Sequence, residues 1–422
     1  MKTALLVNPW IYDFAAHDYG MRPLGLLRIG EHLRRQGKNV VLVDCVSEAA
    51  GKRDPRGFSK IKKIHVNKPA LLKQTARPYF RYGISIGDFT ARLENIRDVE
   101  TIYVASGMTY WYPGVQLAIE LLRRRFGGIP IILGGIYATL CNEHAKEFSG
   151  ADIVWKGDYL TREHFLDVEF SPAYDLLTDC RVLPIQLTRG CPFSCSYCAS
   201  NILAPSFTMK DPVHLFEEVM RAYRYLGAKV FVFYDDAVMH KSTNGIKTFL
   251  RMMAASGAQC VFQTPNGIHA KYVDEELAIL LKKANFKNVR LSLETADESL
   301  QEFTGNKVTN NDLKRALRNL KEAGFDKEDL GVYLLIGAPW LTIERTLEDI
   351  IFVNSLGAQA ILASYSPIPG TRDFSVMAEK GIIEKDLDPL WHNNTIFPEL
   401  LDPTHPDRIR LIRSLTSKLN RM

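Results

Sequence analysis

The segment TRGCPFSCSYCAS, residues 188–200, contains three cysteines within eight residues and follows an apolar run that predicts a β-strand. Cys191, Cys195 and Cys198 are spaced four and three residues apart. Three thiolates at this spacing can bind three different irons at one corner of a cubane cluster and leave the fourth iron without a protein ligand. The spacing therefore predicts a 4Fe–4S cluster with one open coordination position.

Structural zinc and free thiols are the two other interpretations of these cysteines. A structural zinc ion takes four ligands, normally from two separated pairs. Cys180 is the nearest further cysteine, but it has no partner at a matching spacing. An odd total of seven cysteines favours metal ligation in a reducing compartment over a disulfide framework. We expect the other four to be buried as small hydrophobic residues: Cys45, Cys141, Cys180 and Cys260.

Length and composition indicate a protein of more than one domain. The chain has 422 residues, 46% of them hydrophobic, whereas domains usually have roughly 100–200 residues. The net charge of +5 is small and is not concentrated in one block, so we expect no DNA partner. No apolar run reaches the length of a membrane span or has the pattern of a secretory signal. We therefore expect a cytoplasmic protein with no membrane partner.

Residues 1–169 alternate short β-branched runs with amphipathic segments, a pattern typical of an α/β domain. A doubly wound, Rossmann-like parallel sheet is the economical packing for this pattern. Residues 51–89 interrupt the alternation and predict an inserted arm. Strands are expected at 3–8, 39–44, 101–106, 129–133 and 152–155, and helices at 24–36 and 114–125.

A linker is expected at residues 170–180, where periodicity is weak, and a second α/β domain at 181–374. Six repeats of strand and helix predict a partial (β/α)6 barrel, with the cysteine loop at the carboxyl end of its first strand. Residues 375–422 predict a helical tail. The six strands are expected near 182–187, 229–234, 259–263, 288–294, 331–336 and 359–366.

The motif CPFSCSYC, with an aromatic residue directly before its last cysteine, resembles the CxxxCxxC signature of the radical S-adenosylmethionine superfamily. The resemblance covers most of residues 180–370. It implies that the open iron chelates the amino and carboxylate groups of S-adenosylmethionine. It also implies that a reducing partner such as flavodoxin or ferredoxin drives cleavage of this cofactor to a 5′-deoxyadenosyl radical.

The same resemblance implies roles for residues near the strand ends. Tyr197 resembles the residue whose backbone contacts adenine. In FYDDAVM, residues 233–239, Asp235 or Asp236 is expected to meet the methionyl amine, because two adjacent acids cannot both point inward. Further cofactor contacts are implied for Gln263 and Asn266 in QTPNG, Glu294 in LSLET and Gly337 in YLLIGAPW. Helix capping is the alternative role for Asn266 and Glu294.

Residues 1–169 resemble the cobalamin-binding domain found in front of many radical enzymes. PLGLL contains Pro23 and Gly25, and GGIYATL contains Gly134 and Gly135. Glycines at strand ends let a ligand approach the backbone, and helix N-termini favour phosphate. The DxHxxG pattern of many cobalamin proteins is incomplete, because Asp13 is two residues too far from His17.

An aromatic run, SGMTYWYPG at residues 106–114, follows one of the predicted strands. Its Tyr110 and Trp111 either cover a flat macrocycle or pack between the domains. The leading prediction is thus a cobalamin-dependent radical methyltransferase, of class B in this superfamily, acting on an unactivated carbon of a small molecule or peptide. The alternatives are a cobalamin-free radical enzyme for rearrangement, cyclisation or sulfur insertion, and a non-catalytic iron–sulfur or zinc protein.

Overall fold

The computed structural model describes residues 2–54, 57–401 and 405–421, which form two compact units. The first unit comprises Met1–Pro184, Arg224–Ala228 and Asp388–His392. The second unit comprises Ile185–Tyr223, Lys229–Leu387 and Asn393–Met422. Each unit is described below by itself.

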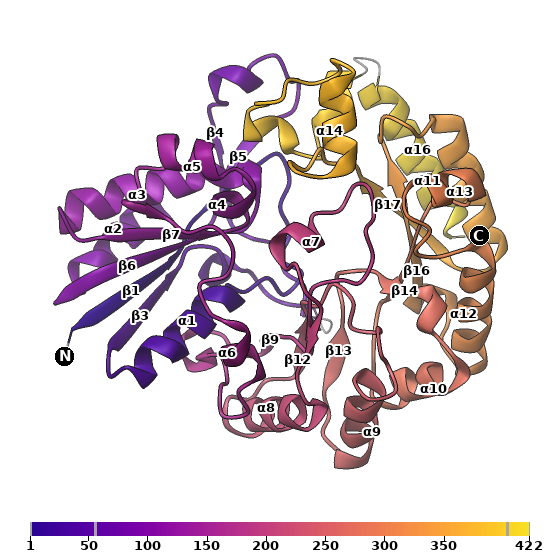
Figure 1. Ribbon diagram of the computed structural model, residues 1–422, viewed down its shortest axis with the longest axis horizontal. Coiled ribbons are helices and arrows are strands. Elements are labelled where there is room, and N and C mark those ends of the chain that lie inside the picture. The colour runs from indigo at the N-terminus through magenta and orange to yellow at the C-terminus, as the bar shows by residue number, and fades with distance from the viewer. Residues whose placement is uncertain (1, 55–56, 402–404, 422) are drawn as a thin grey trace. The chain divides into compact units, whose positions relative to one another are not determined.

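A five-stranded parallel sheet forms the centre of the first unit (Figure 1). Successive residues of a strand point to opposite faces of a sheet. Leu5 and Val7 accordingly belong to a core cluster with Phe89, whereas Ala4 belongs to a separate cluster with Leu26. The strand order is β3 (Asn39–Asp44), β1 (Thr3–Asn8), β6 (Val99–Ser106), β7 (Ile131–Gly135) and β8 (Ile153–Val154).

Helices cover both faces of this sheet, as Figure 1 shows, so the sheet is doubly wound. One face carries α2 (Ile86–Glu94), α3 (Tyr112–Phe126) and α5 (Asn142–Phe148). The other carries α1 (Leu24–Arg35) and α6 (Arg162–Leu166), while the short α4 (Ile136–Leu140) follows β7.

The arm expected at residues 51–89 contains regular structure that its sequence did not reveal. β4 (Lys63–Val66) and β5 (Tyr79–Tyr82) form an antiparallel sheet with β2 (Ile11–Asp13) in the order β2-β5-β4. Most of β4 is exposed, so it lacks the alternation of apolar residues that usually identifies a strand.

The second unit contains five of the six predicted strands, together with the last residue of β9, as a partial barrel. β12 (Val230–Phe233) pairs in parallel with β13 (Val261–Gln263), and the Tyr234 amide donates to the carbonyl of Ile185 at the end of β9 (Val182–Ile185). A parallel bridge between Phe262 and Phe286 joins β13 to the chain that enters β15. The remaining barrel strands form a four-stranded sheet. Its order is β14 (Ile268–His269), β15 (Val289–Glu294), β16 (Leu330–Ile336) and β17 (Gln359–Ser364).

This arrangement confirms the predicted fold class, an N-terminal doubly wound sheet followed by a partial β/α barrel. Aromatic side chains fill part of the barrel core: Phe231, Phe233, Phe249, Phe262 and Phe286 are all buried. The principal helices are α7 (Ser200–Leu203), α8 (Pro212–Tyr225), α9 (Ile246–Ser256), α10 (Glu275–Lys283), α11 (Glu298–Phe303), α12 (Asn310–Glu322), α13 (Ile343–Ser355), α14 (Arg372–Glu379), α15 (Phe397–Leu401) and α16 (His405–Leu419).

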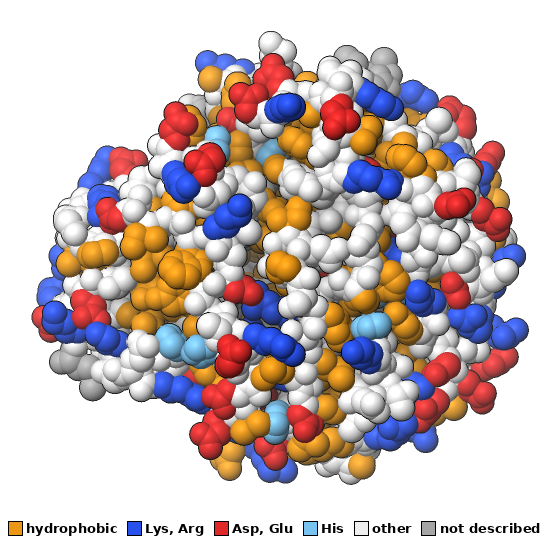
Figure 2. Space-filling model, viewed as in Figure 1, with side chains coloured by type: hydrophobic (Ala, Val, Ile, Leu, Met, Phe, Trp, Pro, Cys, Tyr) orange, Lys and Arg blue, Asp and Glu red, His pale blue; other side chains and the backbone are white. Residues whose placement is uncertain are grey.

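Surface charge of both signs is interspersed on the face drawn in Figure 2, with no large block of one sign. None of the helices within residues 2–54, 57–401 and 405–421 combines the length and apolar character needed to span a bilayer.

Candidate functional site

The cysteine loop of the second unit is closed by a short antiparallel ladder. β10 (Thr188–Arg189) precedes the loop and pairs with β11 (Thr208–Met209) after it. Gly190, directly before the first cysteine, has a φ angle of +76°, and a Cβ there would lie 2.6 Å from the carbonyl oxygen of Ser206. A residue with a side chain would therefore strain this turn. The loop geometry depends on glycine at position 190.

The three predicted ligands are free thiols that influence one another electrostatically. Cys191 and Cys195 are half-buried and Cys198 is exposed. Burial raises the pKa of Cys191 to about 11, and the neighbouring Cys195 and Cys198 contribute to this rise. Bringing thiolates together without a cation costs free energy because their negative charges repel. The three cysteines are therefore suited to binding a positively charged metal centre.

The three cysteines supply the donor set of an iron–sulfur cluster. A cubane needs each thiolate on a different iron, so its ligands do not converge on one point. The donor set of Cys191, Cys195 and Cys198 therefore fits a 4Fe–4S cluster.

Backbone contacts attach the cysteine loop to the rest of the second unit. The Ser196 amide donates to the carbonyl of Thr304 over 3.1 Å, and the Asp373 amide donates to the carbonyl of Ser196 over 3.0 Å. A Cβ on Gly305, which has a φ of +112°, would come within 3.4 Å of Cys195 Cα. The loop after α11 is thus packed directly on the cysteine loop.

Tyr197, Glu294 and Lys307 lie together beside the cysteines. The Lys307 Nζ is 2.6 Å from Glu294 Oε1, and their side chains are only 13% and 11% exposed. The same ammonium lies 5.7 Å from the centre of the Tyr197 ring. Glu294 ends β15 with a φ of +72°, where the pairing with β16 shifts register. Lys307 was not among the residues singled out from the sequence.

The two adjacent acids after β12 have different environments. Asp235 is 1% exposed, and its Oδ1 accepts from the Leu187 amide at 3.0 Å and from the Thr188 hydroxyl at 2.7 Å. Burial raises the pKa of Asp235 to about 7. Asp236 is half-buried; burial raises its pKa, and the Ser200 hydroxyl and Arg189 oppose that rise. Asp236 also contributes to the raised pKa of Cys191, so it is the acid nearer the cysteines.

The other sequence-predicted residues of the second unit lie near the ends of β13 and β16. Gln263 is buried and accepts from Asn288 Nδ2 at 3.3 Å. Asn266 donates through Nδ2 to the carbonyl of Asp235 at 3.0 Å, a contact between loops and not a helix cap. Gly337 directly follows β16 with a φ of +78° and is half-buried.

In the first unit, the predicted glycines differ in their surroundings. Gly135 has a φ of +104°, and a Cβ there would lie 2.5 Å from the carbonyl oxygen of Ser106. Gly134 and Gly25 have open space where a Cβ would be, and Gly25 is exposed. Pro23 is half-buried directly before α1. Gly134 is therefore the predicted strand-end glycine with space for a ligand beside its backbone.

The aromatic run after β6 is held within the first unit. Tyr110 is 6% exposed, and the Trp111 Nε1 donates to Asp13 Oδ2 at 2.8 Å. The other Asp13 oxygen accepts from the Phe14 amide at 2.6 Å, whereas His17 is exposed and lies beside Tyr19. Asp13 thus orients Trp111.

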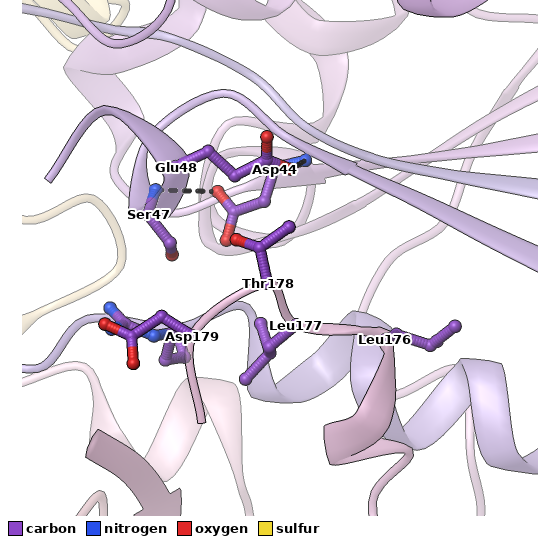
Figure 3. A pocket seen from close by; sticks show the side chains of 8 residues that line it. Asp44, Ser47, Glu48, Leu176, Leu177, Thr178 and Asp179 are labelled. Carbon is purple, nitrogen blue, oxygen red and sulfur yellow. Dashed lines mark hydrogen bonds between the residues drawn. The ribbon is translucent and has the colours of Figure 1, made fainter. Parts of the chain in front are cut away.

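A crevice in the first unit lies at the carboxyl end of β3 (Figure 3). Asp44 Oδ1 accepts from the amides of Val46 and Ser47, both at 3.0 Å, whereas its buried Oδ2 has no hydrogen-bond partner. The crevice is too narrow to admit a water molecule. We therefore assign no ligand to it.

The four other cysteines differ in burial. Cys45 and Cys260 are buried, while Cys141 and Cys180 are half-buried. Cys180 belongs to the first unit, where its Sγ donates to the carbonyl of Tyr174 at 3.2 Å. Full burial is thus confirmed for two of the four.

Residues 185–352 match the family model of the radical SAM superfamily. This segment of the second unit is therefore a radical SAM domain. A 4Fe–4S cluster and S-adenosylmethionine are the cofactors that belong with this domain.

Curated relatives resemble part of the chain. An uncharacterized methyltransferase of Pyrococcus horikoshii is 28% identical over 216 residues, which cover 48% of this chain and 44% of the relative. The anaerobic magnesium-protoporphyrin IX monomethyl ester cyclase of Cereibacter sphaeroides is 25% identical over 170 residues, which cover 39% of this chain and 27% of the relative. The aligned segment thus spans less than half the length of these relatives.

Solved structures share the fold over most of the chain. The radical S-adenosylmethionine methyltransferase TsrM from Kitasatospora setae, solved with cobalamin and a [4Fe–4S] cluster, has a TM-score of 0.62 at 16% identity, covering 90% of this chain and 75% of that one. OxsB, a cobalamin-dependent S-adenosylmethionine radical enzyme solved with aqua-cobalamin, has a TM-score of 0.55 at 13% identity. The match covers 92% of this chain and 56% of OxsB. At these identities the similarity concerns the fold.

Proposed function

We propose that this radical SAM enzyme is a cobalamin-dependent methyltransferase that acts on an unactivated carbon of a small molecule or peptide. The observation that carries the proposal is the fold that 90% of the chain shares with TsrM, a methyltransferase solved with cobalamin and a cluster. The uncharacterized methyltransferase of Pyrococcus horikoshii supports the same reaction class.

Cys191, Cys195 and Cys198 would hold the cluster. When bound and reduced, it supplies the electron that cleaves S-adenosylmethionine and so provides a radical for hydrogen abstraction. Asp236 and Glu294 present carboxylates beside the cysteine loop, where they would accept hydrogen bonds from the methionyl amine or the ribose hydroxyls. Tyr197 would contact adenine through its backbone. Gly337 has a left-handed conformation that favours glycine, and because glycine has no side chain it would leave room for the adenine ring.

The first unit would hold the cobalamin at the carboxyl edge of its sheet. The open Gly134 gives a ligand access to the backbone after β7, and Trp111 offers a half-buried aromatic surface fixed by Asp13. When bound, methylcobalamin supplies the methyl group. We propose that His17 is not an axial ligand, because its spacing from Asp13 does not match the DxHxxG pattern.

Cyclisation without cobalamin is the second candidate function, and the magnesium-protoporphyrin IX monomethyl ester cyclase among the relatives supports only its first part, the cyclisation. Both candidates use the cysteine loop and a reducing partner such as flavodoxin or ferredoxin. They differ in whether the first unit binds a corrin.

An anaerobic assay distinguishes the two functions. The protein is expressed with added hydroxocobalamin, reconstituted with iron and sulfide, and incubated with dithionite and S-adenosylmethionine. Methyl transfer predicts extractable corrin in the purified protein and formation of 5′-deoxyadenosine. Formation of 5′-deoxyadenosine by protein that binds no corrin favours the cyclase class. Failure to form either the cluster or 5′-deoxyadenosine contradicts both.

A further inference from the structure

The loop that carries Lys307 joins α11 to α12 and has a fixed conformation. Asn310 donates through Nδ2 to the carbonyl of Ala296 at 2.8 Å, and Gln301 Nε2 donates to the carbonyl of Thr295 at 2.8 Å. The same Gln301 Nε2 donates to Asn310 Oδ1 at 2.9 Å. Since Thr304 also accepts from the Ser196 amide, Lys307 is held on a loop bonded directly to the cysteine loop.

The Lys307 ammonium interacts with more negative charge than a single ion pair provides. Its direct partner is Glu294, at 2.6 Å. The pKa of Lys307 is nevertheless raised against the effect of burial, and the charges responsible include Cys195 and Cys198 in addition to Glu294. Lys307 in turn opposes the rise in the pKa of Cys195 that burial causes. The Lys307 ammonium thus lies against Glu294 and beside the ring of Tyr197, which stands between Cys195 and Cys198 in the sequence.

A charge in this position affects the reduction of a cluster. One-electron reduction adds a negative charge, and a nearby cation favours the reduced state because charges interact strongly where water is excluded. Net charge and solvent exposure are established determinants of iron–sulfur potentials. The carboxylate of Glu294 acts in the opposite direction.

We propose that Lys307 is a positioning residue that compensates the charge of the cysteine loop and raises the reduction potential of the cluster, while Glu294 lowers that potential. This inference rests on the proposed function only in requiring that the loop bind a 4Fe–4S cluster. The competing interpretation is an ion pair that serves the fold alone.

The test is a redox titration of the reconstituted protein followed by electron paramagnetic resonance, without S-adenosylmethionine. We compare the wild type with Lys307→Met, Lys307→Arg and Glu294→Gln. At a fixed potential, Lys307→Met is expected to lower the ratio of reduced to oxidised cluster about tenfold, which is about 59 mV for a one-electron couple. Lys307→Arg keeps the charge and is expected to stay near the wild type. Glu294→Gln is expected to raise the ratio.

Both variants lose the same ion pair, so a purely structural effect would shift the reduction potential in the same direction in both. Opposite shifts for Lys307→Met and Glu294→Gln therefore support the inference. An unchanged potential in Lys307→Met that retains its iron, or shifts of the same sign in both variants, overturns it. If Lys307→Met does not retain the cluster, Glu294→Gln decides: a rise supports the inference and an unchanged potential overturns it. A wild-type protein that forms no 4Fe–4S cluster contradicts the proposed function itself.

Discussion

The Thr188 hydroxyl donates to Asp235 Oδ1 over 2.7 Å, which ties the strand before the cysteine loop to the end of β12. The Leu187 amide donates to the same carboxylate. The buried Asp235 therefore organises the start of the loop, and we propose that Asp236 is the acid that meets a cofactor.

Substitution of these two acids is expected to separate stability from binding. Asp235→Ala leaves buried donors without an acceptor, at about 1–3 kcal/mol for each group. We expect its free energy of unfolding to fall by about 3 kcal/mol, and that of Asp236→Ala by less than about 1 kcal/mol. Asp236→Ala is instead expected to weaken S-adenosylmethionine binding about tenfold, the effect of losing roughly 1.4 kcal/mol. Urea unfolding measures the stability of both variants, and equilibrium dialysis measures their binding of S-adenosylmethionine. A large loss of stability in Asp236→Ala with weaker binding in Asp235→Ala would contradict these assignments.

The buried His269 is expected to make stability depend on pH. Burial, with Lys307, Lys271 and His240 nearby, lowers its pKa from 6.5 to about 3. The unfolded chain therefore binds a proton between pH 6.5 and 3 that the folded chain does not bind, so this contribution to stability is lost as the pH falls.

Between pH 6.5 and 5 the loss from His269 is expected to be about 1–2 kcal/mol. His269 packs against the rings of Phe193 and Tyr272, so His269→Gln lowers stability at every pH, but it should flatten this dependence. Urea midpoints of both proteins at several pH values test the difference. Parallel curves would mean that His269 has the same pKa in the folded and the unfolded chain.

Two neighbouring glycines provide a matched test of cobalamin binding. In Gly134→Ala the new methyl group has open space, so stability should change by less than about 0.5 kcal/mol. Gly135→Ala combines a φ of +104° with a clash against Ser106 and should lower stability by about 1–3 kcal/mol. If a corrin approaches the backbone at Gly134, the first variant should bind hydroxocobalamin at least about tenfold more weakly, as followed by absorbance. Wild-type affinity in Gly134→Ala would place the corrin elsewhere.

The turn before the first cysteine should be needed for cluster assembly. Gly190→Ala places a methyl group 2.6 Å from a carbonyl oxygen at a φ of +76°. We expect less than half of the wild-type iron after reconstitution, because the strain falls on the residue next to Cys191. Gly227→Ala, which shares a positive φ but has open space, is the control and should retain its iron. Equal iron in both variants would show that the turn adapts.

The strands at Thr3–Asn8 and Asn39–Asp44 agree with the prediction residue for residue, because each is a compact apolar run with polar or turn-forming neighbours. The exposed β4 has no such pattern and was missed. The cysteine loop was recognisable because its ligands are close in sequence.

The remainder of the candidate site depends on contacts that the sequence does not show. Asp235 is the buried acid of the pair because of where β12 ends and because its carboxylate accepts a hydrogen bond from the Thr188 hydroxyl. Lys307 was missed because it lies 13 residues from Glu294 and no short-range pattern relates them. Long-range pairs of this kind become visible only when the fold brings their loops together.

We propose that Cys191, Cys195 and Cys198 hold a cluster whose fourth iron is open to S-adenosylmethionine. The most direct measurement is electron paramagnetic resonance of the reduced, reconstituted protein before and after addition of S-adenosylmethionine, combined with iron and zinc analysis. Cys195→Ala should abolish the signal, whereas Cys180→Ala should preserve it. We expect a 4Fe–4S signal that changes on addition of the cofactor. A single bound zinc ion, or a cluster signal that the cofactor leaves unchanged and that requires Cys180, would contradict it.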